Sequence, residues 1–152
     1  MHLIDGETGS GKTEVYLKLA SYLIEQGHQV LILLPEIVLT NQLLQRFTER
    51  LGVKPTEWHS RLGAKARREN FQQIMTGKTQ FIIGARSALF LPYHNLKMIV
   101  VDEEHDRSYK QEEGAIYHAR DMAIIRAKSI DAKVLLVSAT PSLESYHNAK
   151  IG

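Results

Sequence analysis

Short apolar runs alternate with longer amphipathic stretches along almost the whole chain. Runs rich in β-branched residues predict buried strands, and they lie at Leu3–Ile4, Val30–Leu34, Phe81–Ile83, Met98–Val101 and Val134–Val137, with a weaker candidate at Thr56–His59. Stretches with helical spacing lie between or after them, at Lys12–Gln26, Val38–Leu51, Ala64–Met75, Arg120–Ser129 and Ser142–Lys150. Gly27 and Gly52 follow the first two helices, where glycine commonly ends a helix.

This alternation of strands and helices favours an α/β fold with a doubly wound, mainly parallel sheet and helices on both faces. A length of 152 residues fits one domain, so we predict a single unit over residues 1–152. In such folds ligands bind at the carboxyl ends of the strands. Gly84–Leu96 and Glu104–His118 lack clear periodicity, and loops of that length in a compact domain are usually functional.

Composition narrows the class of protein. The chain is 43% hydrophobic and 24% charged, which is typical of a globular protein. The longest apolar run, Val30–Leu34, is too short to span a bilayer, so no membrane partner is expected. The chain has no cysteine, which excludes disulfides and thiolate metal sites and fits a cytoplasmic location. A net charge of +2 means that any surface for nucleic acid must be local.

A phosphate-binding motif, G-x-x-x-x-G-K-[ST], stands near the start of the chain. Its residues are Gly6, Glu7, Thr8, Gly9, Ser10, Gly11, Lys12 and Thr13. In this motif backbone N–H groups surround phosphate oxygens, the lysine reaches the β- and γ-phosphates, and the hydroxyl of Thr13 can bind Mg²⁺. A glycine-rich turn before a helix would explain the glycines, but not Lys12, whose charge opposes the helix dipole. A bound phosphate would explain that lysine.

The apolar strand Met98–Val101 ends in the acidic sequence Asp102-Glu103-Glu104-His105. Asp102 would hold Mg²⁺ directly or through water, and Glu103 would act as a general base on the attacking water. Solvated acids at a strand end are the alternative, which the upstream phosphate motif disfavours.

A third motif closes the next buried strand. Taken alone, the tripeptide Ser138-Ala139-Thr140 is an ordinary helix N-cap. However, the order P-loop, D-E-x-H and S-A-T, each closing a strand, resembles that of motifs I, II and III in superfamily 2 helicases.

The resemblance narrows to the replication-restart helicases of the primosome, and it covers nearly the whole chain. The segments that carry it are Gly6–Leu17, Leu34–Thr40, Gly84–Phe90, Asp102–Asp106, Ala119–Asp121 and Ser138–Ser142. It implies a RecA-like P-loop NTPase domain, the first of the two lobes of a motor. It also implies that Gly6–Thr13 bind ATP, that His105 couples the γ-phosphate to the second lobe, and that Ser138–Thr140 form the coupling motif III.

The same resemblance implies contacts with one DNA strand. Thr40 would lie in motif Ia, and Arg86 and Ser87 in motif Ib; all three suit phosphate contacts. Arg86 would alternatively be a surface salt-bridge partner. Asp106–His118 resembles an aromatic-rich loop that senses single-stranded DNA.

That loop offers specific groups to a DNA strand. Tyr109 and Tyr117 would stack on bases and Lys110 would contact a phosphate. The alternative is that both tyrosines pin the loop to the core.

Two further features have no assigned role. His59 has no second ligand or acid in a suitable position, so we expect a structural histidine or a secondary DNA contact. A basic face at helical spacing follows it, at Arg61, Lys65, Arg67 and Arg68. Such faces are usually solvated, although nucleic-acid contact remains open.

By resemblance, the chain is expected to be a fragment of an ATP-dependent 3′-to-5′ DNA helicase that uses Mg²⁺. The expected partners are single-stranded and forked DNA, the second RecA-like lobe, primosome proteins and single-strand-binding proteins. Zinc is expected only in other parts of such a protein. Without a second lobe to supply an arginine finger, the isolated lobe should hydrolyse ATP negligibly, and no adenine-reading segment is visible before Gly6. The alternatives are another superfamily 2 DNA translocase, a P-loop kinase, or a nucleotide-dependent binding module.

Overall fold

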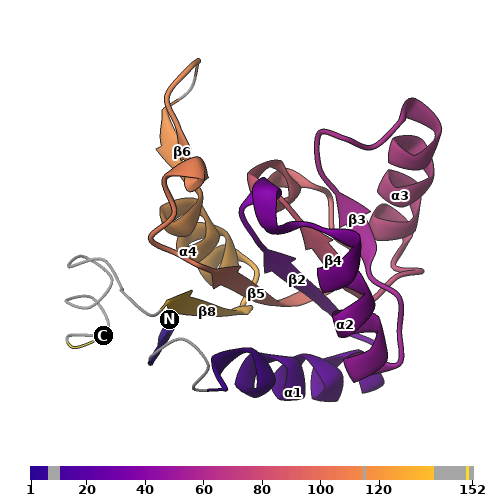
Figure 1. The fold of residues 1–152 in the computed structure, drawn as a ribbon, viewed down its shortest axis with the longest axis horizontal. Helices are drawn as coiled ribbons and strands as arrows, with labels where there is room; N and C mark the ends of the chain where they lie inside the picture. Colours follow the sequence, from indigo (N-terminus) through magenta and orange to yellow (C-terminus); the bar gives the residue numbers. More distant parts are fainter. Residues whose placement is uncertain (7–10, 115, 139–149, 151–152) are drawn as a thin grey trace.

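The computed structural model of the chain describes residues 1–6, 11–114, 116–138 and 150, and Figure 1 shows a central sheet flanked by helices. Six parallel strands form the sheet in the order β1-β8-β5-β2-β4-β3. Their bounds are β1 (His2–Asp5), β2 (Gln29–Leu33), β3 (Thr56–Trp58), β4 (Phe81–Gly84), β5 (Leu96–Asp102) and β8 (Lys133–Ser138). The predicted parallel α/β fold is confirmed, and the weak candidate near Thr56 is the edge strand β3.

Helices cover both faces of this sheet. Their bounds are α1 (Lys12–Glu25), α2 (Asn41–Leu51), α3 (Ala64–Thr76) and α4 (Ala119–Ser129). Side chains alternate between the two faces along a strand, so Val30 and Ile32 of β2 pack with α1 and α2 while Leu31 and Leu33 pack with α3 and α4. The central strands are therefore buried on both sides, which explains their continuous apolar runs.

The second helix begins later than the apolar spacing predicted. The pattern suggested a helix over Val38–Leu51, but the structure has a short 3₁₀ turn, η1 (Glu36–Val38), and then α2 from Asn41. Thr40 has an extended backbone, and its Oγ1 accepts a hydrogen bond from the N–H of Leu43 at 3.2 Å. Thr40 is therefore the N-cap of α2, and the helix begins at Asn41.

Both segments without periodicity carry short ordered elements. The first holds the 3₁₀ helix η2 (Arg86–Phe90), and the second holds η3 (Arg107–Tyr109) and a hairpin of β6 (Lys110–Gln111) with β7 (Tyr117–His118). This hairpin, drawn in orange, extends away from the sheet in Figure 1. The stretch Ser142–Lys150, predicted as a helix, lies outside the described residues except for Lys150. Among the described helices, none is long and apolar enough to cross a membrane.

Candidate active site and nucleic-acid groove

The strand order brings the three predicted motifs to one edge of the sheet. β8 lies between β1 and β5, and the register pairs Asp5 with Ser138 and Asp102 with Val137. Because all three strands are parallel, the segments that follow them leave the sheet at the same edge. The acidic motif, the start of motif III and the segment leading to the P-loop are therefore neighbours.

The P-loop itself is described only in part, because Glu7, Thr8, Gly9 and Ser10 lie outside the described residues. Gly11 has φ 85°, a left-handed backbone that glycine adopts readily. Lys12 opens α1, and its Nζ donates a hydrogen bond to the carbonyl oxygen of Gly6. The lysine thus reaches back to the residue that opens the motif. Phosphate binding by Gly6–Thr13 stays a prediction.

Asp102, at the end of β5, is buried against the helix that follows the P-loop. The hydroxyl of Tyr16 donates to Oδ2 of Asp102 at 2.6 Å, and the N–H of Glu103 donates to Oδ1 at 2.9 Å. Tyr16 itself is fully buried. Sequence reasoning assigned Tyr16 no role, although it lies in the segment that carried the resemblance. It positions the carboxylate that is predicted to hold Mg²⁺.

Burial controls the ionisation of this pair. It raises the pKa of the Asp102 carboxyl, and the neighbouring Glu103 raises it further, while the Tyr16 hydrogen bond and the charge of Lys12 act in the opposite direction. Burial also raises the pKa of Tyr16, which therefore remains a hydrogen-bond donor at neutral pH. A cation beside Asp102 would favour the ionised carboxylate. The residues present therefore fit Mg²⁺, which proteins usually bind through one or two carboxylates plus phosphate oxygens and water.

Replacing Asp102 with asparagine should leave the fold as stable as the parent, or more stable, near pH 7.5. The folded pKa of Asp102 is raised above its unfolded value, so its contribution to stability is lost as pH rises through the folded pKa. Asparagine cannot ionise, and its single oxygen still accepts from Tyr16, so only the part-buried N–H of Glu103 loses its acceptor. Thermal unfolding between pH 4 and pH 8 should show the advantage of Asp102→Asn growing with pH. The exposed Asp5→Asn variant is the control, and a large loss of stability in Asp102→Asn at pH 7.5 would contradict this account.

Glu103 and His105 occupy the turn directly after β5. Glu103 has φ 52°, a strained conformation that is common at functional sites. His105 Nδ1 lies 2.6 Å from Ser138 Oγ, and His105 Nε2 lies 3.6 Å from Glu103 Oε2. The histidine thus connects the acidic motif to the start of motif III. Ala139 and Thr140 lie outside the described residues.

A buried ion pair lies behind this turn. Glu104 is fully buried, its N–H donates to the carbonyl of Val137 at 3.1 Å, and its Oε2 lies 3.6 Å from NH1 of Arg120. Arg120 belongs to the first turn of α4 and also donates from Nε to Asp121 at 3.0 Å. Sequence reasoning did not assign either partner, although both lie in segments that carried the resemblance. The pair joins β5, β8 and α4 beneath the predicted catalytic residues.

A cavity of 520 Å³ opens at the carboxyl ends of β2, β3 and β4. Its lining includes Glu36, Ser60, Arg67, Arg86, Ser87 and Lys110, from four separate segments. We call it the nucleic-acid groove. Gly84, where β4 ends beside it, approaches Trp58 so closely that a Cβ would lie 2.6 Å from the Trp58 carbonyl oxygen. Only glycine therefore fits at the start of the segment that leads to Arg86 and Ser87.

Arg86 holds the hairpin segment against this groove. Its NH1 donates to the carbonyls of Ser108 at 3.0 Å and Lys110 at 2.8 Å, and its guanidinium lies 5.8 Å from the ring centroid of Tyr117. Phe90 packs edge-on against the same ring, with centroids 5.1 Å apart. These contacts, rather than an ion pair, anchor Arg86 among the described residues.

Tyr109 does not lie where the sequence prediction placed it. Its side chain is 0% exposed, and its hydroxyl donates to the carbonyls of Leu33 at 3.0 Å and Asp102. A ring without an exposed face cannot stack on a base, so the prediction of base stacking is corrected for Tyr109. This residue instead pins the loop to the sheet, which was the alternative. Tyr117 is half-buried, and Lys110 is exposed beside Glu112 at 3.4 Å.

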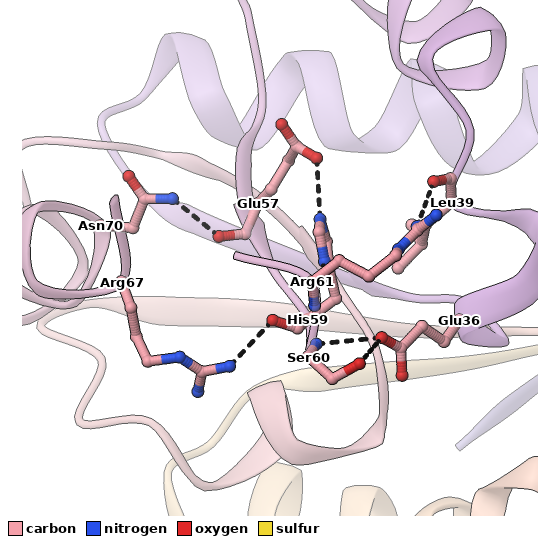
Figure 2. Close-up of polar contacts among 8 residues, drawn as sticks. All are labelled: Glu36, Leu39, Glu57, His59, Ser60, Arg61, Arg67 and Asn70. Carbon is pink, nitrogen blue, oxygen red and sulfur yellow. Dashed lines mark hydrogen bonds and ion pairs between the residues drawn. The ribbon is translucent and has the colours of Figure 1, made fainter. Parts of the chain in front are cut away.

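The turn between β3 and α3 is braced by a network shown in Figure 2. His59 is buried, with Nε2 3.0 Å from Glu57 Oε1 and Nδ1 accepting from the N–H of Arg61 at 3.2 Å. It is therefore a structural histidine in this conformation. The N–H and hydroxyl of Ser60 both donate to Glu36, and the hydroxyl contact lowers the pKa of that carboxyl.

Two arginines of the predicted basic face belong to the same network. Arg61 donates to the carbonyl of Leu39 at 2.6 Å, and Arg67 donates to the carbonyl of His59 at 2.9 Å while lying 4.7 Å from the Trp58 ring centroid. Arg61 thus joins the turn to the segment before α2, and Arg67 joins it to α3. Both side chains therefore have structural contacts, whereas the sequence suggested a solvated basic face. Lys65 and Arg68 are exposed.

Comparison with known proteins defines the class to which this site belongs. A family model described as DEAD/DEAH box helicase matches residues 1–149, and the chain belongs to this family. Among curated proteins, replication restart protein PriA of Rickettsia prowazekii is 52% identical over 149 residues, and that of Bacillus subtilis is 45% identical over 150 residues. These matches cover 97% and 99% of the chain but only 23% and 19% of the two relatives. The chain therefore spans about a fifth of their length.

Solved helicase structures share the fold at lower identity. RecG bound to a three-way DNA junction superposes with a TM-score of 0.67 at 22% identity, covering 97% of this chain and 19% of RecG. Mycobacterium smegmatis helicase Lhr, bound to single-stranded DNA and AMP-PNP, gives a TM-score of 0.58 at 11% identity, covering 91% of this chain and 19% of Lhr. At these identities the likeness supports the fold alone.

Proposed function

We propose that the chain is the first, ATP-binding RecA-like lobe of an ATP-dependent 3′-to-5′ DNA helicase that acts in replication-fork restart and primosome assembly. The observation that carries this proposal is the junction of the motifs at one sheet edge, where Tyr16 of the P-loop helix holds Asp102 and His105 contacts Ser138. The identity of 45–52% to several PriA proteins over nearly the whole chain supports the particular process.

ATP and Mg²⁺ are the proposed ligands of this edge. Gly6–Thr13 would hold the phosphates, with Thr13 and Asp102 binding the metal ion, which supplies charge neutralisation at the phosphates when bound. Glu103 would accept a proton from the attacking water. Among the described residues no group of three or more His, Asp or Glu side chains is placed to hold a metal ion. In this proposal phosphate oxygens and water supply the other ligands, as is usual for Mg²⁺.

His105 is proposed to link nucleotide state to movement. It lies between the proposed general base Glu103 and Ser138 of motif III, and its side chain is 39% exposed. A second RecA-like lobe that closes over this edge would therefore contact the histidine directly. Ser138, Ala139 and Thr140 would carry the coupling onward.

Single-stranded and forked DNA are the proposed partners of the nucleic-acid groove. Arg86, Ser87 and Lys110 line it, and each offers a hydrogen-bond donor to a phosphate. Thr40 stands at the start of α2, where the helix dipole also favours an anion. Tyr117 remains a proposed stacking residue, with its ring held by Phe90 and Arg86.

The remaining partners rest on the sequence resemblance alone. We place the protein in the cytoplasm, with primosome and single-strand-binding proteins as partners, and with any zinc bound by other parts of the full-length protein. In this proposal the complete ATPase needs an arginine from the second lobe.

The isolated chain should bind nucleotide and hydrolyse it negligibly. An arginine finger contributes about 10³- to 10⁵-fold to the rate in related NTPases, so phosphate release from Mg·ATP should stay near background with or without single-stranded DNA. Binding of Mg·ADP and of a fluorescent oligothymidylate should still be measurable by titration. Rapid, DNA-stimulated hydrolysis by this chain would contradict the proposed division of the site between two lobes.

A further inference from the structure

One acidic side chain lines the nucleic-acid groove. Glu36, from η1, shares the cavity with the cationic side chains of Arg67, Arg86 and Lys110, and it is the only acid among the described lining residues. Glu36 takes part in none of the ion pairs within 4.0 Å that the described part of the chain forms. A carboxylate repels the phosphates of a nucleic acid. Its presence in a groove of cations therefore requires a physical reason.

The Glu36 carboxylate accepts two hydrogen bonds from a single residue. The N–H of Ser60 donates to Glu36 Oε1 at 3.0 Å, and the Ser60 hydroxyl donates to the same oxygen (Figure 2). The hydroxyl bond has the largest effect on the pKa of Glu36 and lowers it, so the carboxyl is ionised at neutral pH. Backbone N–H groups and serine hydroxyls are also common donors to the phosphate oxygens of DNA. Ser60 thus gives the carboxylate the same pair of donors that a phosphate would use.

The fold holds these two partners with different firmness. Ser60 directly follows the buried His59, whose carbonyl accepts from Arg67 of α3 at 2.9 Å. Glu36 belongs to η1, none of whose three residues is buried, and its neighbour Ile37 is 85% exposed. A segment with few buried apolar contacts can move at a low cost in free energy. The donors of Ser60 are therefore fixed, whereas the carboxylate that accepts from them can leave.

We propose that Glu36 competes with the DNA strand for Ser60. Without DNA the carboxylate holds the N–H and the hydroxyl of Ser60, and a phosphate of the bound single strand displaces it and takes over both hydrogen bonds. The strand gains these bonds only when those to Glu36 break, so Glu36 lowers the affinity of the groove and makes each phosphate easier to release. The proposal rests on the proposed binding of DNA in the nucleic-acid groove and deepens it, because it names the residue that limits this affinity.

The test measures binding of a fluorescent oligothymidylate by anisotropy at a fixed salt concentration. Glu36→Ala should bind about 10-fold more tightly than the parent, because the phosphate no longer has to displace a charged acceptor. Ser60→Ala alone should change the affinity less than about twofold, because the free and the bound chain each lose one hydrogen bond. The double variant should lose most of the gain and bind within about threefold of the parent. Glu113→Ala removes an exposed acid between β6 and β7 and should change the affinity less than about twofold.

The outcomes separate this competition from the proposed groove itself. A double variant as tight as Glu36→Ala would overturn the competition, because simple charge repulsion does not depend on the Ser60 hydroxyl. A Glu36→Ala variant no tighter than the parent would also overturn it and make Glu36 a permanent brace of the turn, while the groove stands. Glu36→Gln keeps the shape and a weaker acceptor, so it should give a smaller gain and replaces alanine if thermal melting shows that Glu36→Ala is not folded. If neither the parent nor any variant binds the oligonucleotide, both proposals are wrong.

Discussion

Replacing Lys12 with alanine will weaken Mg·ATP binding by on the order of 100-fold or more, because each charge-assisted hydrogen bond to a phosphate contributes about 1.5–3 kcal/mol. The half-buried Lys12 ammonium stands at the start of α1 and reaches the carbonyl of Gly6 across the loop. A bound phosphate could therefore replace that carbonyl as the hydrogen-bond acceptor of Lys12. Titration of the parent and variant chains with Mg·ATP measures the loss.

The stability of the nucleotide-free fold gives the control for this result. Lys12 is half-buried at the start of α1 and donates to the carbonyl of Gly6, and we expect the melting temperature of Lys12→Ala without nucleotide to stay close to that of the parent. Lys18→Ala, which removes an exposed lysine further along the same helix, should bind Mg·ATP normally. Retention of parental affinity by Lys12→Ala would show that Gly6–Thr13 is not a phosphate site.

Replacing Glu104 with glutamine will cost about 3 kcal/mol of unfolding free energy, because the buried Arg120 guanidinium loses its buried carboxylate and keeps only the exposed one of Asp121. Glu104 is 0% and Arg120 8% exposed, so water cannot replace the lost partner. For a chain of this size such a loss corresponds to a fall in melting temperature of about 10 °C. Thermal and urea unfolding of the parent and variant chains measure it.

A double substitution distinguishes the loss of a charge partner from the loss of side-chain packing. Glu104→Leu combined with Arg120→Met removes both charges, and it should recover much of the stability lost in Glu104→Gln. Glu112→Gln breaks an exposed pair with Lys110, with side chains 73% and 55% exposed, and should leave the melting temperature unchanged. A melting temperature of Glu104→Gln equal to that of the parent would mean that the buried pair does not hold α4 to the sheet.

Much of the fold was predictable from local patterns. The buried runs around Val30, Phe81, Met98 and Val134 all became parallel strands, because strands covered on both faces need continuous apolar residues. The helix boundary at Asn41 was not predictable from apolar spacing. It depends on the cap at Thr40, and the periodicity of the preceding Val38 matched a helix equally well.

The candidate site was predictable in its parts but not in its connections. The P-loop and the acidic motif are recognisable because each needs particular residues at adjacent positions. Tyr16 is a helix residue like any other until β5 places Asp102 2.6 Å from its hydroxyl. For Tyr109 the sequence suggested a role that the structure does not support. A tyrosine in an aperiodic loop suggests an exposed ring, but the Tyr109 hydroxyl donates to the carbonyls of Leu33 and Asp102 at two strand ends, and its ring is buried.

The sequence by itself determined the buried strands, the approximate positions of α1 to α4 and the motifs that close the strands, because these depend on residues close together in the chain. Only the tertiary structure decided that β8 inserts between β1 and β5, so that His105 meets Ser138 and Glu104 meets Arg120. Such contacts depend on which strands pair and which helices pack together, and that choice minimises the free energy of the whole core rather than of any one segment.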